Sequence, residues 1–456
     1  MERLGLLDAE FWDLEDEHVA LHIGAIAVFD GPVPSARDLT DRYLARLDRM
    51  PRLRQKMRGV RFNLARPRWF DDPAFDLSYH LRRTAVPHPG TPEQLNTAIG
   101  RIMSFHLDQS RPLWEAWIVE GLADDQWALV FKVHHSIVDG VSGMKMFSAF
   151  LDDDEWRPVG RSGSAPAALV DAARDVLRTA RSIALRPDRT VRTLGHAARG
   201  VVRFAGALRP VTKTSLTGAL GTPRRYRPAS VELADVDTVR RTLGGTRNDV
   251  VLAMVTRAFR ELLISRGEQP GPHAVRCLVP VAVGRGHRDG INVGNSAGNS
   301  VGNKVSAMLV DLPVEFADIE TAYAAIGERM HELKSSAETE AGATAASVAE
   351  HLPTFLVSAI VRGALRVPHR VLTTVTTNVP GPRTTRTLLG HRMVAVYPYV
   401  PIADGIRIGV AVVSYADQLQ FGITCDRASV DDIEVFVNAL EDGLRELLKI
   451  ASGTHA

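Results

Sequence analysis

The residues whose types and spacing could do chemistry stand together at positions 134–140, where the chain reads His-His-Ser-Ile-Val-Asp-Gly. They follow the apolar run 127–133, which has the character of a buried strand. A neutral imidazole at the end of such a strand can take a proton from an alcohol or an amine as that group attacks a carbonyl carbon. The pattern therefore predicts His135 as a general base.

The other residues of this stretch would support that chemistry. Asp139 follows His135 across a turn, so we expect it to brace the local backbone rather than to relay a proton. Gly140 would keep that turn open. Adjacent histidines in a strand point to opposite faces and no third ligand stands nearby, so His134 and His135 do not predict a metal site. The alternative is that both histidines only close the strand through hydrogen bonds.

A hairpin is predicted to deliver the histidines. The segments 114–119 and 127–133 have the composition of strands, and Gly121 and the polar residues after it stand between them. A helix is predicted directly after Gly140, over 141–151. The histidines would then lie between the end of a buried strand and the start of a helix.

Further elements are predicted on both sides of this unit. Thr91, Pro92 and Gln94 have the pattern of a capping box at the start of a helix. The remaining apolar patterns predict strands over 21–29, 274–283, 304–310, 371–377, 406–415 and 418–425, and helices over 35–48, 250–264, 316–334, 345–365 and 431–450.

The length of 456 residues exceeds one ordinary core, which predicts two domains. The stretch 152–166 is acidic and then carries Gly, Ser and Pro, as at a domain boundary. We therefore predict an N-terminal domain over 1–155, a helical basic connector over 156–230 and a C-terminal domain over 231–456.

The connector carries Arg174, Arg178 and Arg181 on one helical face. This pattern is typical of a basic amphipathic helix that rests on anionic lipid. The alternative is a crossover helix between the two domains with a solvated arginine face.

Composition narrows the class of protein. A formal net charge of +2 gives no reason to expect a nucleic-acid partner. Cys277 and Cys425 both stand in apolar runs, so neither a disulfide framework nor a thiolate metal site is predicted, which suits the cytoplasm. No secretory signal is visible, and no apolar run approaches the roughly 18 residues of a spanning helix. Any contact with the inner membrane or with lipid bodies would be peripheral.

Several motifs beyond the histidines point to one family. The histidine stretch itself resembles the motif of the chloramphenicol-acetyltransferase-like superfamily, which moves acyl groups from thioesters. The motifs at 111–114 (Arg-Pro-Leu-Trp), 248–253 (Asn-Asp-Val-Val-Leu-Ala), 302–303 (Gly-Asn) and 378–382 (Asn-Val-Pro-Gly-Pro) resemble the signature set of the bacterial wax ester synthase/diacylglycerol acyltransferase family. Order and spacing match from Asp8 to about Leu448, and 396–401 with 405–409 resemble its actinobacterial branch.

The resemblance implies an α/β fold of two chloramphenicol-acetyltransferase-like domains, each a mixed sheet flanked by helices. The two would form a pseudo-dimer around a central tunnel. Acyl-CoA would enter from one side and a hydrophobic alcohol, either diacylglycerol or a long-chain fatty alcohol, from the other. His135 would deprotonate the hydroxyl, which attacks the thioester directly without an acyl-enzyme intermediate. Neither a metal nor another cofactor is implied, and the oligomeric state stays open.

Polar residues of the other motifs are candidates for supporting roles. The amides of Asn248 and Asn378 could donate to the tetrahedral oxyanion or position substrate. The alternative is that Asn248 only caps a helix and Asn378 only forms a turn before Pro380. Asp139 is predicted to pair with Arg276 on a neighbouring strand.

Other motif residues are predicted to support the fold or the acyl chain. Asp249 and Asn303 would give structural support, and Asn303 is favoured among the asparagines of the Gly-Asn loop because it directly precedes a strand. The segment Pro112, Leu113 and Trp114 suits packing, although it could also line an acyl channel. The family's Leu-Ser-Pro-x-Asp opening reads Gly-Leu-Leu-Asp-Ala here at 5–9, which leaves substrate choice open.

Two alternatives remain beside the lipid-forming O-acyltransferase. One is an acyltransferase of specialised metabolism that uses a carrier-protein thioester or a non-lipid alcohol. The Asp-Phe-Gly-Trp-Gly stretch of nonribosomal condensation domains is not found, which disfavours the condensation reaction itself. The other is a non-catalytic lipid-body protein, which the intact His135 and Asp139 argue against.

Overall fold

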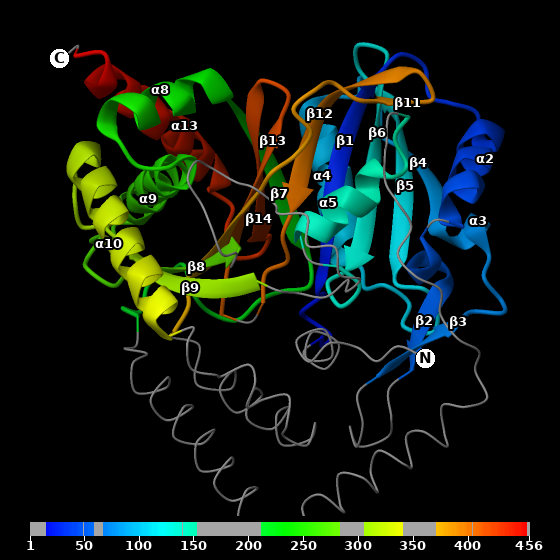
Figure 1. Cartoon of the computed structure of the whole chain (residues 1–456), viewed down its shortest axis with the longest axis horizontal. Helices are drawn as coiled ribbons and strands as arrows, with labels where there is room; N and C mark the ends of the chain where they lie inside the picture. Colours follow the sequence, from blue (N-terminus) through cyan, green and yellow to red (C-terminus); the bar gives the residue numbers. More distant parts are fainter. Residues whose placement is uncertain are drawn as a thin grey trace, which may run out of the picture.

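The computed structural model describes residues 15–48, 50–58, 67–138, 140–152, 211–282, 305–340, 371–403 and 405–453. These residues form two lobes that lie side by side, each built on a six-stranded sheet (Figure 1). Both sheets are mixed, because each contains parallel and antiparallel neighbours. The predicted α/β fold of two mixed sheets flanked by helices is confirmed.

The sheet of the N-terminal lobe carries the histidine motif at the end of a central strand. Its strands, in spatial order, are β11 (Thr387–Leu388), β12 (His391–Tyr399), β1 (His22–Asp30), β6 (Gln126–His134), β5 (Trp114–Leu122) and β4 (Leu81–Ala85). Strands β5 and β6 form the predicted hairpin, with Trp114 opposite Val133. On the other side of β6, His134 lies opposite His22 of β1. The end of β6 is thus held from both sides.

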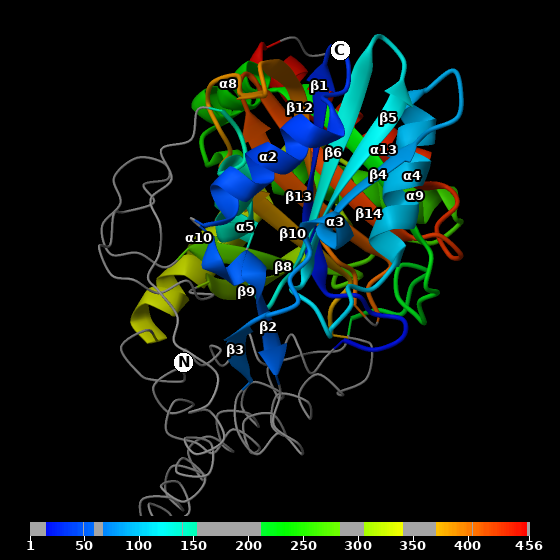
Figure 2. The same cartoon turned by 90° about the vertical axis from the view of Figure 1, so that its right-hand side faces the viewer.

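Helices cover both faces of this sheet. Helices α2 (Ala36–Leu47) and α5 (Gly140–Ser148) contribute to the same core as Phe29, whereas α4 (Pro92–Ser104) packs with Val28 on the other face (Figure 2). The alternation of β1 explains this division, because successive side chains of a strand point to opposite faces. The capping box of Thr91 and Gln94 starts α4 as predicted. A smaller layer comprises η1 (Pro51–Arg54), the hairpin of β2 (Gln55–Arg58) and β3 (Arg68–Asp71), and α3 (Leu77–His80).

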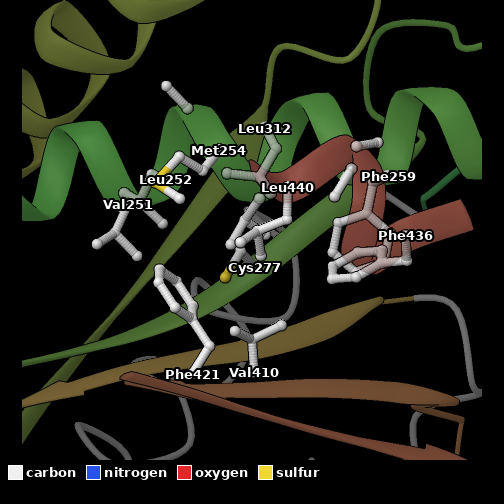
Figure 3. Packing of buried hydrophobic residues seen from close by; sticks show 14 of the residues in the cluster. Val251, Leu252, Met254, Phe259, Cys277, Leu312, Val410, Phe421, Phe436 and Leu440 are labelled. Atoms are coloured by element: carbon white, nitrogen blue, oxygen red, sulfur yellow. The ribbon is translucent and has the colours of Figure 1, made fainter. Parts of the chain in front are cut away.

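The C-terminal lobe buries one large hydrophobic core. Its strands, in spatial order, are β7 (Arg224–Glu232), β14 (Gln418–Asp426), β13 (Ile408–Tyr415), β10 (Thr374–Val379), β8 (Val275–Ala282) and β9 (Val305–Leu312). Its helices are α8 (Leu233–Leu243), α9 (Arg247–Ser265), α10 (Ile319–Glu340) and α13 (Ile433–Ala451). Figure 3 shows Val410 and Phe421 of the sheet below the apolar side chains of α9 and α13. Phe259 of α9 and Phe436 of α13 pack edge to face, with their ring centroids 4.9 Å apart.

The lobes do not follow the predicted division of the sequence. Strand β7 already begins at Arg224, inside the stretch predicted as connector. Strands β11 and β12 come from the C-terminal part of the chain but belong to the sheet of the N-terminal lobe, where β12 pairs with β1. Residues 156–210 of the predicted connector, with their arginines, and the helix predicted over 345–365 lie outside the described residues.

Strand β12 also joins the two sheets through side chains. Three buried contacts reach its backbone from the C-terminal lobe: the Val396 N–H donates to Gln420 Oε1 at 2.7 Å, the Tyr226 hydroxyl donates to the Pro398 carbonyl at 2.9 Å, and the Tyr415 hydroxyl donates to the Met393 carbonyl at 2.7 Å. Buried backbone groups need such partners. The lobes are therefore fastened to one another by hydrogen bonds as well as by apolar packing.

Candidate active site

His135 begins the turn that follows β6. Its backbone N–H donates to the Leu21 carbonyl at 2.9 Å, which continues the pairing between β6 and β1 by one residue. By the alternation of that strand, His135 lies on the same face as Phe131 and Val133, the face covered by α5. The residue is half-buried. An imidazole in this place is held at its backbone and still accessible to a substrate.

His134 lies on the opposite face and is wholly buried. Its Nδ1 lies 3.1 Å from the Ser136 amide nitrogen and 2.6 Å from Ser136 Oγ, and its Nε2 lies 3.6 Å from Glu15 Oε2. Both ring nitrogens of His134 therefore face other groups of the protein, Ser136 and Glu15. The geometry therefore gives His134 a supporting role, and His135 is the histidine of the pair that can meet substrate.

The lobes meet beside the histidine motif. Helix α5 begins at Gly140, directly after the motif, and contacts β10 of the other lobe. Asn378 stands near the carboxyl end of β10 and is half-buried, and its neighbour Val379 packs against the core of the N-terminal lobe. The structure thus brings Asn378 to the seam between the lobes. Asp139 lies outside the described residues.

The start of α9 differs from the prediction. We expected Asn248 as the candidate cap, but the cap is Thr246, whose side chain accepts from the Asp249 N–H. Asp249 completes a capping box by accepting the Thr246 N–H at 2.8 Å. Asn248 is therefore wrong as the cap and occupies the first turn of the helix, half-buried in the C-terminal lobe.

Arg276 finds a carboxylate on the neighbouring strand. Its Nε donates to Asp311 Oδ1 at 2.6 Å, and the register places these two residues directly opposite each other on β8 and β9. Asp311 also contacts His273 Nδ1 at 2.6 Å. Burial alone would raise the pKa of Asp311, but these two partners together hold it below its ordinary value. The predicted pairing of Arg276 with Asp139 stays a prediction, as does the role of Asn303, because Asp139 and Asn303 lie outside the described residues.

The segment Pro112, Leu113 and Trp114 is buried and holds the hairpin in place. Trp114 donates from Nε1 to the Leu53 carbonyl at 2.7 Å and stacks on His80. The Leu113 carbonyl accepts the His134 N–H at 3.0 Å. These contacts are those of packing residues that also fix the histidine stretch, and a role in an acyl channel stays a prediction.

Glu15 and Ser136 are candidate site residues that the sequence analysis missed. Glu15 stands in the acidic run 15–17 and looks there like one of several solvated carboxylates. Only the structure shows that its side chain is 3% exposed and faces His134. Ser136 lies inside the motif, but its type alone did not predict a contact with the preceding histidine.

The described residues line two cavities away from the histidine motif. Two cavities, of about 420 and 300 Å³, are lined by α2 with the turn before β12, and by the start of α9 with α10. Neither is lined by His135, so the tunnel between the lobes stays a prediction. The described part of the chain contains no group of three or more His, Cys, Asp or Glu residues that could hold a metal ion.

Both cysteines are buried. Burial raises the pKa of Cys277 and of Cys425 to about 12, so neither thiol is a nucleophile at neutral pH. Within the described ranges, no helix combines the length and the apolar character needed to cross a membrane.

Comparison with known families covers both lobes. The model described as wax ester synthase/diacylglycerol acyltransferase catalytic domain matches residues 4–251, and the WS/DGAT C-terminal domain matches residues 301–448. A probable diacylglycerol O-acyltransferase of Mycobacterium tuberculosis strain ATCC 25618/H37Rv is 36% identical, over 99% of this chain and 96% of the relative. A putative diacylglycerol O-acyltransferase of the same strain is 33% identical, over 99% of this chain and 92% of the relative.

Solved structures agree with this result. The wax ester synthase/diacylglycerol acyltransferase from Marinobacter aquaeolei VT8 superposes with a TM-score of 0.65 at 25% identity, over 99% of this chain and all of that one. The first condensation domain of the CDA synthetase superposes with a TM-score of 0.58 at 15% identity, over 100% and 97% of the two chains, which shows a shared fold. The family models, the relatives along the full length and the superposed structure together show that this chain belongs to the wax ester synthase/diacylglycerol acyltransferase family.

Proposed function

We propose that this acyltransferase moves a fatty acyl group from acyl-CoA to the hydroxyl of diacylglycerol or of a long-chain alcohol, with His135 as the general base. The observation that carries the proposal is the place of His135, which stands half-buried at the end of β6 with its backbone fixed by the Leu21 carbonyl. Family membership supports acyl-CoA as donor and a lipid alcohol as acceptor.

The reaction needs one base and donors for one oxyanion. His135 takes the proton of the acceptor hydroxyl while the oxygen attacks the thioester carbonyl carbon, forming the new C–O bond. The tetrahedral intermediate collapses, the C–S bond breaks, and the CoA thiolate receives the proton from the His135 imidazolium. Neither an acyl-enzyme nor a metal or other cofactor takes part in this scheme.

The oxyanion would be stabilised from the seam between the lobes. The side-chain amide of Asn378 is the first candidate donor, because β10 carries it to the seam beside α5. Asn248 is a second candidate, since its side chain is not occupied as the cap of α9. A base of this kind contributes about 10²- to 10⁴-fold in rate, so such donors are needed in addition.

The acceptors named here partition into lipid, so the enzyme would work at a lipid surface. We propose peripheral contact with the inner membrane or with lipid bodies. The arginines predicted to make that contact lie outside the described residues. Flotation with anionic and neutral vesicles tests this point, and binding to neither would refute it.

The decisive experiment measures free CoA released from palmitoyl-CoA with diacylglycerol, with hexadecanol and without acceptor. Release that depends on acceptor and is lost in His135→Ala would support acyl transfer with His135 as base. The exposed His331 on α10 provides the matched control, because His331→Ala should leave the rate unchanged. Release with neither alcohol, from folded protein, would instead favour a specialised acceptor, a carrier-protein donor or a non-catalytic lipid-binding role.

A further inference from the structure

A buried carboxylate lies behind the histidine pair. The side chain of Glu15 is 3% exposed, yet it carries a charge that needs compensation. Its Oε1 accepts the Leu21 N–H at 3.0 Å, and its Oε2 accepts from Gln109 Nε2 at 3.0 Å and lies 3.6 Å from His134 Nε2. Two N–H groups therefore donate to its two oxygens, and a third nitrogen, His134 Nε2, faces one of them. An ionised carboxylate, which has acceptors and no donors, fits both hydrogen bonds and the nearby imidazole.

The contacts of His134 fix its tautomer. A backbone N–H can only donate, so the Ser136 amide requires that His134 Nδ1 accept and carry no proton. The Ser136 hydroxyl donates to the same nitrogen at 2.6 Å. The proton of the neutral ring must then sit on Nε2, which faces Glu15. His134 is thereby held by hydrogen bonds on one side of its ring and by a carboxylate on the other.

The same carboxylate reaches His135 through the backbone. Leu21 donates its N–H to Glu15, and the Leu21 carbonyl accepts the His135 N–H at 2.9 Å. Because His134 and His135 are covalent neighbours, the contacts close a ring that runs from Glu15 through Leu21, His135 and His134 back to Glu15. The Ile137 N–H donates to the His134 carbonyl at 2.9 Å and closes the turn. The direction in which the His135 side chain leaves the backbone is therefore fixed from both sides.

We infer that Glu15 is a positioning residue for His135, acting through the imidazole of His134 and the backbone of Leu21. The inference rests on the proposed function, since it concerns the base of that reaction. An error of about 1 Å in the place of a catalytic group can cost about 100-fold in rate, so a group that fixes this direction affects turnover without touching substrate.

The charge of Glu15 persists at neutral pH. Burial by itself would raise the pKa of this carboxyl group. The contacts with His134, Gln109 and the Leu21 amide outweigh burial, and the pKa of Glu15 lies below its ordinary value. Near neutrality the carboxylate therefore remains an acceptor for Leu21 and Gln109 and a negative charge beside His134.

Glu15→Gln is the direct test, because the amide keeps the shape but removes the charge and turns an NH₂ group toward one of the three nitrogens that face the carboxylate. We expect kcat for palmitoyl-CoA and the preferred acceptor to fall by about 10- to 100-fold, with KM for palmitoyl-CoA unchanged within about twofold. Glu17→Gln is the matched control, since Glu17 lies two residues away with an 87% exposed side chain. Glu15→Asp keeps the charge and should retain more activity than Glu15→Gln, which separates the role of the carboxylate from general damage.

The double variant shows through which residue Glu15 acts. Glu15→Gln in the His135→Ala background should cause no further loss of the residual rate, because residues that act as a unit are not additive. The inference is overturned if Glu15→Gln loses the same factor in both backgrounds, if it raises KM alone, or if it matches the wild type. Wild-type protein without acceptor-dependent release would instead contradict the proposed function. An active wild type that loses activity in His135→Ala but not in Glu15→Gln would contradict only this inference.

Discussion

Lys132 donates from Nζ to the Ile102 carbonyl at 3.1 Å, in the interior of the N-terminal lobe. The lysine stands on β6, two residues before the histidine pair, and its side chain is wholly buried. It also donates to the Phe105 carbonyl. Both carbonyls belong to the end of α4, where an α-helix leaves acceptors without partners. The strand that ends at the histidine pair thus also supplies a side chain to the carboxyl end of α4, on the face of the sheet opposite that of His135.

This contact predicts an alkaline dependence of stability. Burial lowers the pKa of Lys132 to about 8, although Glu115 and Glu15 act in the opposite direction. Between that value and the ordinary pKa of about 10.5, the unfolded chain binds the proton and the folded chain does not, so the free energy of unfolding rises with pH. Relative to Lys132→Met, the wild type should gain on the order of 1 kcal/mol per pH unit there. Urea unfolding of both proteins at pH 7, 8, 9 and 10 measures this difference in the free energy of unfolding. The same pH dependence in both proteins would contradict the prediction.

His80 predicts a loss of stability in acid. Its Nδ1–H donates to the Trp114 carbonyl at 2.7 Å, and its ring is stacked between Phe75 and Trp114. Burial lowers the pKa of His80, although the hydrogen bond to Trp114 opposes that shift. The stability that this neutral ring contributes is complete above about pH 6.5 and is lost as pH falls through the lowered folded pKa.

Between pH 7.5 and pH 5.5, the Tm of His80→Phe should therefore fall less than the Tm of the wild type, as measured by thermal unfolding. The exposed His331 serves again as control, and His331→Gln should keep the wild-type dependence. Equal losses in His80→Phe and the wild type would show that this ring does not carry the effect.

The start of α9 allows stability and catalysis to be tested separately, at two positions that lie two residues apart. Thr246→Ala removes the cap and should lower the free energy of unfolding by about 1 kcal/mol with kcat unchanged. Asn248→Ala should leave stability near that of the wild type and lower kcat by about 100-fold if its amide donates to the oxyanion. Thermal unfolding and CoA release on the same preparations measure both quantities. Full activity in Asn248→Ala would remove it as an oxyanion donor and leave Asn378.

Gly422 stands where the two sheets approach each other closely. A Cβ at this position would overlap the Pro398 carbonyl oxygen of β12 and lie 2.6 Å from the Tyr226 hydroxyl. Gly422→Ala should therefore lower the free energy of unfolding by about 3 kcal/mol or more. Gly327→Ala on α10 is the matched control, because its Cβ would meet nothing within 4 Å, and it should be neutral or stabilising by up to about 1 kcal/mol. The Tm values and soluble yields of Gly422→Ala and Gly327→Ala test this prediction. Equal Tm values and yields for the two variants would contradict it.

Features set by neighbouring residues could be predicted from the sequence. The hairpin that delivers His135 and the capping box of Thr91 depend on residues a few positions apart, and both are present. The cap of α9 shows the limit of this reasoning, because Asn248 is a capping residue by type while the actual box starts at Thr246. The residue type was right for a helix start, but the position was wrong by two residues.

Features set by distant residues could not be predicted in this way. Strand β12 contains Pro398, which disfavours a strand, and its partner β1 stands near the other end of the chain. Arg276 meets Asp311 only because β8 and β9 pair in one register. Glu15 is surrounded by acidic residues in the sequence, and its burial depends on the fold around His134. Such contacts depend on register and packing, which local patterns do not contain.

The place of β12 in the chain has a consequence for biosynthesis. Strands β1, β5 and β6 leave the ribosome within the first 134 residues, whereas the strand that covers the edge of β1 ends at residue 399 of 456. Until then the nascent chain presents a row of unpaired backbone groups between apolar side chains, and such edges promote aggregation. The sheet that carries the histidine pair is therefore complete only after residue 399 has been translated.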